Sequence, residues 1–123
     1  MAAGRYNILI EQGATFNLQL FLKDANGDPI DVAGWTGCGQ IRRTHNDNSP
    51  VQEFTVTFPL PTTDGQVLIA LTPSQTQGIA VDRQSNATGP QIYYYDIFLT
   101  RADGFVFRLI EGEAKVSPSI TRC

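Results

Sequence analysis

The longest regular pattern of apolar positions lies near the end of the chain, over residues 91–118. It predicts two long β-strands joined by a turn at residues 101–104, because Asp-Gly between apolar runs is a strong hairpin signal. The first strand is apolar on both faces. One face carries Tyr93, Tyr95, Ile97 and Leu99, and the other carries Ile92, Tyr94 and Phe98. Such a strand is central in a sheet or covers a partner.

Shorter alternating runs predict further strands at residues 5–10, 14–23, 30–42, 51–58 and 66–71. A period of two marks a strand with one buried face. The positions expected to face inward are Phe16, Leu18, Leu20, Leu22, Phe54, Val56, Phe58, Val67, Ile69 and Leu71. Gly37 and Gly39 beside Trp35 predict a bulge or the close approach of another backbone.

Turn and helix signals separate these runs. Asn26-Gly27 predicts a hairpin turn. Thr72 followed by Pro73 predicts a capped helical turn over residues 72–77, crossing from one sheet to the other. With about seven strands and turn signals between them, we predict an all-β fold: an antiparallel two-sheet β-sandwich, immunoglobulin-like, with one short helical turn. Residues 1–123 form a single domain of this kind.

Composition narrows the classes of partner. Only 17% of residues are charged and the net charge is −3, so the chain lacks the basic excess that phosphate contacts need. No apolar run is long enough for a signal peptide or a membrane span. We therefore expect a protein made in the cytoplasm that binds neither nucleic acid nor membrane. Cys38 and Cys123 can pair or stay free, and we expect two free thiols in a reducing cytosol.

Candidate chemistry is sparse. The only histidine, His45, falls in a polar loop, so a histidine-based triad or a zinc site is poorly supported. Asp24, Asn26 and Asp28 faintly resemble a calcium loop, but the glycine spacing favours an ordinary turn. Glu111 and Glu113 share a face of the last strand and are either an acid/base pair or charges that protect a sheet edge. We expect no enzyme, no cofactor and no metal.

Aromatic side chains are the remaining candidates for function. Aromatic residues are enriched at protein interfaces, although each one can also simply fill the core. The candidate interface residues are Phe21, Trp35, Tyr94, Phe98, Phe105 and Phe107.

Three segments together resemble a known family. They are ILIEQGATFNLQLFLKDANGDPIDVAGWTGCGQIR, YYYDIFLT and GFVFRLIEGEAKVSPSITR, and the correspondence spans residues 8–122. They resemble small immunoglobulin-like structural proteins of tailed bacteriophages, including the amino-terminal domains of upper baseplate proteins. Such proteins carry bulkier residues where this chain has Gly37-Cys38-Gly39.

The resemblance implies a structural protein of the virion, in the tail, baseplate or fibre-attachment apparatus, as an adaptor. Its partners would be other phage virion proteins, in a symmetric assembly with copies of itself. One alternative is a capsid decoration protein. Another is a carbohydrate- or ligand-binding module that uses Trp35 and the tyrosines as stacking platforms.

Overall fold

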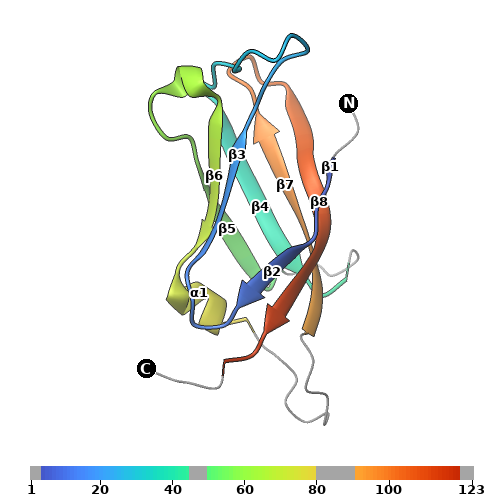
Figure 1. Cartoon of the computed structure of the whole chain (residues 1–123). Helices are drawn as coiled ribbons and strands as arrows, with labels where there is room; N and C mark the ends of the chain where they lie inside the picture. Colours follow the sequence, from blue (N-terminus) through green and yellow to red (C-terminus); the bar gives the residue numbers. More distant parts are fainter. Residues whose placement is uncertain (1–3, 45–49, 80–90, 120–123) are drawn as a thin grey trace.

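The computed structural model describes residues 4–44, 50–79 and 91–119, and most of them lie in β-strands (Figure 1). The predicted loop around His45, the loop at 82–90 and Cys123 lie outside these ranges. The strands are β1 (Gly4–Arg5), β2 (Ile8–Glu11), β3 (Phe16–Phe21), β4 (Thr36–Arg42), β5 (Gln52–Thr57), β6 (Gln66–Leu71), β7 (Gln91–Thr100) and β8 (Val106–Ser117). A 3-10 turn, η1 (Thr62–Asp64), and a short helix, α1 (Pro73–Gln77), complete the elements. The prediction of a mostly-β chain with one helical turn is confirmed.

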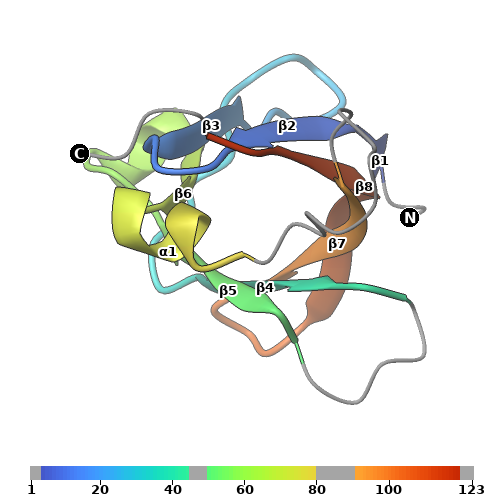
Figure 2. The ribbon, with the colours of Figure 1, turned by 90° about the horizontal axis from the view of Figure 1, so that it is seen from below.

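The strands join into one curled sheet, in the order β1-β8-β7-β4-β5-β6-β3. Seen from one end, it wraps into a half-barrel (Figure 2). The two halves of the sheet meet at β5, which pairs with β4 up to Phe54 and with β6 from Thr55 onward. Because one strand belongs to both halves, the predicted division into two separate sheets is not confirmed.

The first predicted strand, residues 5–10, is instead two short strands, and both pair with β8 in parallel. The prediction of a wholly antiparallel sheet is therefore wrong. The break falls at Tyr6 and Asn7, which bond to neighbouring strands. The Tyr6 carbonyl accepts the Tyr95 hydroxyl at 2.5 Å, and Asn7 Oδ1 accepts the Glu113 backbone N–H at 3.0 Å.

The predicted central hairpin is confirmed. β7 and β8 pair from Gln91–Val116 to Thr100–Val106. The turn closes through Gly104 N–H on the Arg101 carbonyl, at 2.9 Å. Gly104 has φ of +91°, a conformation that glycine adopts without steric cost. A bulge near Ile97 and Phe98 inserts one extra residue in β8.

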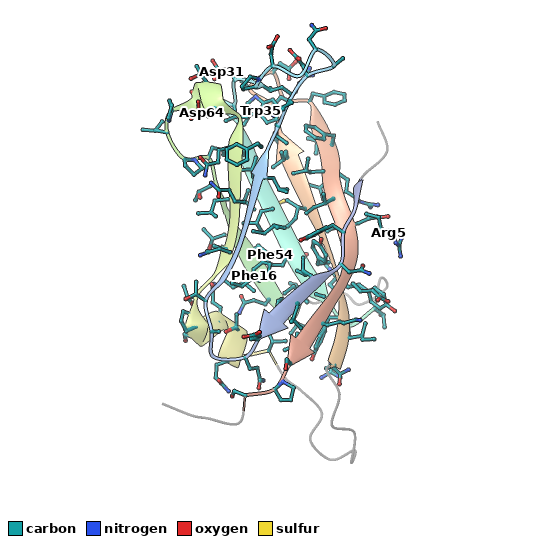
Figure 3. All side chains as sticks on the ribbon, in the orientation of Figure 1. Arg5, Phe16, Asp31, Trp35, Phe54 and Asp64 are labelled. Carbon is teal, nitrogen blue, oxygen red and sulfur yellow. The ribbon has the colours of Figure 1, made fainter. Side chains whose placement is uncertain are left out.

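The core lies inside the curl. The alternation of β7 into two faces is confirmed, and the structure shows that the face formed by Tyr93, Tyr95, Ile97 and Leu99 is the buried one. Val67, Ile69 and Leu71 of β6 are also buried, which confirms their predicted direction. In Figure 3, Phe16 and Phe54 both point into this interior, and their ring centroids lie 6.1 Å apart.

The glycines of β4 sit where opposing side chains crowd the strand. Pairing of β4 with β7 runs without a register shift, so the predicted bulge is absent and close approach is the reason for the glycines. A Cβ on Gly37 would lie 2.9 Å from Leu99 Cδ2. The predicted third strand also begins later than expected, at Thr36, because residues 30–32 bond to loops and not to a strand ladder.

The helical turn lies at the lower end of the half-barrel, beside β6 (Figures 1 and 2). Thr72 caps it as predicted: its hydroxyl accepts the Gln75 N–H at 3.2 Å, and Gln75 Oε1 accepts the Thr72 N–H at 2.9 Å. The Thr76 hydroxyl, fully buried, donates to the Ala14 carbonyl at 2.9 Å. The Thr76–Ala14 bond fixes the helix against the connection between β2 and β3.

Candidate interaction surface

The predicted interface aromatics lie in three separate places and do not form one surface. Trp35 lies at the upper end (Figure 3), where β8 begins with Phe105 directly before it and Phe107 near its start. Tyr94 and Phe98 lie on the outer face of β7, and Phe21 is the last residue of the end strand β3. The three places have different degrees of burial.

At the upper end, most of the aromatic area is used inside the protein. Trp35 and Phe107 meet edge to face with ring centroids 6.0 Å apart, and both pack against the core. Phe105 is 54% exposed and carries the Arg101 guanidinium 4.6 Å above its ring. Of the three predicted residues here, only Phe105 offers a largely exposed ring.

Asp103 holds Arg101 in place over that ring. Its carboxylate accepts Arg101 Nη2 at 2.6 Å and the Phe105 backbone N–H at 3.1 Å. The hydrogen bond from Arg101, followed by the backbone bond from Phe105, lowers the pKa of Asp103 below its usual value. This turn is therefore ordered by local hydrogen bonds.

The outer face of β7 is the surface with the most varied chemistry. Its outward positions are Ile92, Tyr94, Asp96 and Phe98, because the alternate positions are committed to the core. Register places Phe98 between Cys38 of β4 and Arg108 of β8, and Asp96 between Gln40 and Glu111. We call this the outer β4–β7–β8 face. It combines aromatic rings with charged groups.

Arg108 is the centre of that face. Its guanidinium donates to Glu111 at 2.7 Å, lies 3.5 Å from the Asp96 carboxylate, and sits 5.2 Å from the centroid of the Phe98 ring. Arg5 of β1 reaches Glu111 from the other side, at 3.9 Å. Arg108 is thus held in one position by two carboxylates and a ring.

A shallow hollow of about 220 Å³ lies beside this network. Four strands contribute to its wall, and the residues are Arg5, Gln40, Arg42, Thr44, Tyr94, Tyr95, Asp96, Arg108, Glu111 and Gly112. Arg42 Nη2 donates to Gln40 Oε1 at 2.6 Å on the far side. The hollow is therefore polar, and three of its four strands contribute an arginine to the wall: Arg5, Arg42 and Arg108.

Glu111 and Glu113 do not have the predicted role of edge charges. Glu111 is paired with Asp96 of β7 and Arg5 of β1, and the Glu113 N–H donates to Asn7 Oδ1 between β1 and β2, so neither residue lies at an open edge. Glu111 is an ion-pair partner of Arg5 and Arg108, which leaves it poorly placed as half of an acid/base pair. In the described ranges, no cluster of three or more His, Cys, Asp or Glu residues could hold a metal ion.

Two of the tyrosines expected as stacking platforms are in the core. Tyr93 and Tyr95 are 1% and 4% exposed. Burial raises the pKa of Tyr93, against an opposing effect of Arg43. Burial, with a smaller contribution from Tyr6, raises the pKa of Tyr95 to about 12. Neither ring can stack on a ligand.

Sequence reasoning missed the charged members of the outer face: Arg5, Arg42, Asp96 and Arg108. The available signal was the alternation itself, since the polar position Asp96 interrupts an otherwise apolar outer row of β7. The sequence pattern does not reveal the strand register that brings Arg5 and Arg108 to the same carboxylate.

The fold leaves Cys38 as an exposed free thiol on the outer β4–β7–β8 face. The described part of the chain has no helix that is long and apolar enough to cross a membrane.

Known proteins show only weak similarity to this chain. No family model and no curated protein sequence matches the chain. The chain is similar to a chain in a structure of ICOS with ICOS-L and an anti-ICOS-L VNAR domain, at a TM-score of 0.43 and 8% identity, over 95% of this chain and 56% of that one. It is also similar to a family 123 glycoside hydrolase from Clostridium perfringens, at a TM-score of 0.40 and 12% identity, over 97% and 24%. This chain thus spans about half or less of each, and likeness at this level identifies neither a family nor an activity.

Proposed function

We propose that this chain is a structural component of a tailed-phage virion, an adaptor in the tail, baseplate or fibre-attachment apparatus that acts through protein–protein contacts. The sequence resemblance over residues 8–122 supports the class of protein, with its immunoglobulin-like fold. The outer β4–β7–β8 face supports the mode of action, and it is the observation that carries the proposal.

The outer β4–β7–β8 face carries residue types that are common at protein–protein interfaces. Tyrosine, phenylalanine and arginine are enriched where proteins bind each other, because they offer large area with few rotatable bonds or several hydrogen-bond donors. Phe98 and Arg108 are register partners on β7 and β8, and Tyr94 lies farther along the same outward row of β7, beyond Asp96. Since Arg108 is already held by Asp96 and Glu111, less side-chain entropy is lost when a partner covers it.

The carbohydrate-binding alternative loses much of its support. It requires Trp35 and the tyrosines as exposed rings, but Trp35 packs against Phe107 and the core, and Tyr93 and Tyr95 are buried. Among the tyrosines of β7, only Tyr94 points outward. A capsid decoration protein would use the same kind of surface, so the location within the particle has to be measured.

The first test is the composition of the particle. Mass spectrometry of purified virions should detect the protein in many copies, and its absence would refute the proposal. Labelled particles viewed by electron microscopy should carry label on the tail. Label on the capsid faces would refute the adaptor role in favour of decoration.

The second test concerns the outer face itself. Tyr94→Ala and Arg108→Ala should reduce incorporation into particles while lowering the melting temperature only slightly, because both side chains are at least partly exposed. Thr57→Ala, at an exposed position of β5 outside this face, is the matched control. Equal incorporation of all three variants would exclude the face as the binding surface.

A further inference from the structure

In the part of the chain that the structure describes, the end strand β3 has one hydrogen-bonding edge without a partner strand. It closes the order of the sheet, and among the described residues it pairs only with β6. β2 leads into it through a short turn but pairs with β8 instead. An edge of this kind is a template on which another strand can add.

The alternation of hydrogen bonds between β3 and β6 shows which backbone groups of β3 point to the open edge. The Leu22 N–H donates to the Gly65 carbonyl at 2.8 Å, and the β3–β6 register continues this pairing as Leu20–Val67, Leu18–Ile69 and Phe16–Leu71. In an antiparallel ladder alternate residues bond to the same neighbour. The backbone N–H and C=O groups of Asn17, Gln19 and Phe21 therefore point away from β6.

The edge has none of the usual features that prevent strand addition. Natural edges carry charges, proline or bulges. Residues 14–22 are ATFNLQLFL, without a charged residue or a proline, and Phe16–Phe21 within them pair with β6 without a register shift. The core is also incompletely covered here. The inward residues Phe16, Leu18, Leu20 and Leu22 are only half-buried, while their partners Val67, Ile69 and Leu71 are at most 1% exposed.

We propose that a second copy of this chain docks on this edge, with the two β3 strands antiparallel about a two-fold axis at Gln19. In that register Gln19 faces Gln19 of the second copy, and Asn17 faces Phe21. These are the residues whose backbone groups point to the open edge, so the three facing pairs exchange about six hydrogen bonds. If the two β3 strands were shifted by one residue, the free backbone groups of one copy would face residues of the other copy whose backbone groups already bond to β6.

The side chains are also self-complementary in this register. Leu18 lies opposite Leu20 of the second copy on the core side, which extends the half-buried apolar row across the axis. Gln19 and Asn17 remain on the outer side, and the nearest charged residue along the strand, Lys23, lies opposite Thr15. No like charges meet, although each chain carries a net charge of −3. These features favour a second copy over a foreign strand.

This inference rests only on the assembly part of the proposed function and uses a different surface. The outer β4–β7–β8 face would stay free in the dimer for another virion protein. The two ideas can fail separately, because a dimer in solution does not require presence in virions, and presence in virions does not require this dimer.

The test is the mass of the purified chain in solution, measured by light scattering and sedimentation with a reductant present so that Cys38 stays reduced. We expect a dimer of the 13.5 kDa chain. Gln19→Glu and Gln19→Lys each place like charges opposite each other at the axis, and each should raise the dissociation constant at low salt roughly fivefold or more. An equimolar mixture of the two variants should restore dimerisation, because unlike charges then meet.

Thr57→Glu is the matched control: it adds the same charge at an exposed position of an interior strand and should leave the dimer intact. Gln19→Pro is a second variant that should prevent dimerisation, because the backbone N–H that it removes points to the open edge and not to β6. Melting temperatures close to that of the unsubstituted chain would show that the variants fold. A chain that is monomeric at all concentrations would overturn the proposal and leave the edge to another protein. A dimer that survives the Gln19 substitutions as well as Thr57→Glu, or a mixture without recovery, would overturn it too.

Discussion

Gly39 of β4 provides a direct test of how the core is packed. A Cβ added there would overlap Ile97 Cδ1 and would lie 3.0 Å from the Asp96 carbonyl oxygen and 3.2 Å from Phe54 Cδ2. Ile97 is 0% exposed and Phe54 is 7% exposed, so neither side chain can move out into solvent. We therefore expect Gly39→Ala to strain the core.

The size of the effect follows from two opposing contributions. Overpacking a well-packed core costs about 1–3 kcal/mol. Replacing glycine by alanine within a strand recovers roughly 0.5–1 kcal/mol of chain entropy. The difference is a fall of up to about 2.5 kcal/mol in the free energy of unfolding, with a middle value of roughly 1 kcal/mol. For a domain of this size, that middle value lowers the melting temperature by roughly 4 °C.

A double-mutant cycle in urea identifies the clashing atom. Ile97→Val removes Cδ1 and should cost about 0.5–1.5 kcal/mol alone. Combined with Gly39→Ala, it should cost less than the sum of the two, because the methyl that the new Cβ meets is absent. Gly78→Ala is the control, since its added Cβ would meet only ordinary contacts at 3.5 Å with a negative φ of −75°. Additive costs, or an unchanged stability of Gly39→Ala, would refute the packing argument.

Three further predictions concern hydrogen bonds. Tyr95→Phe should lower the free energy of unfolding by about 1 kcal/mol, because the Tyr6 carbonyl loses its donor. Since the pKa of Tyr95 is raised from 10.0 to about 12, its contribution is complete below pH 10 and lost as the pH rises toward 12, so Tyr95→Phe should flatten alkaline unfolding curves over that range. Thr76→Val should lower the free energy of unfolding by about 0.5–1.5 kcal/mol in chemical denaturation, because the buried Thr76 hydroxyl accepts the Gly13 N–H and donates to the Ala14 carbonyl; a neutral effect would contradict this. By NMR, the carboxyl of Asp103 should titrate with a pKa below 3.8, and its pKa should move back toward that value in Arg101→Ala. The stability that this carboxylate contributes to the folded state is present above the unfolded-state pKa and is lost as the pH falls through the lower pKa of the folded state.

The sequence determined the local parts of this fold. The Asp-Gly turn and the alternation on both sides of it defined the β7–β8 hairpin, because both signals act between residues close in the chain. The same holds for the inward faces of β3, β5 and β6 and for the capping box at Thr72. For the candidate surface, alternation alone predicted that Tyr94 and Phe98 point to one side and the core residues to the other.

The tertiary structure decided everything that depends on which strands meet. β5 exchanges one partner for another between Phe54 and Thr55, and this exchange turns two expected sheets into one curled sheet. The parallel pairing of β1 and β2 brings Arg5 to Glu111, and the β7–β8 register brings Arg108 to the same carboxylate and to Phe98. Trp35 and Phe107 pack against the core and meet each other edge to face. These contacts join residues far apart in the chain, and a periodicity of two describes the direction of a side chain but not its neighbour on the next strand.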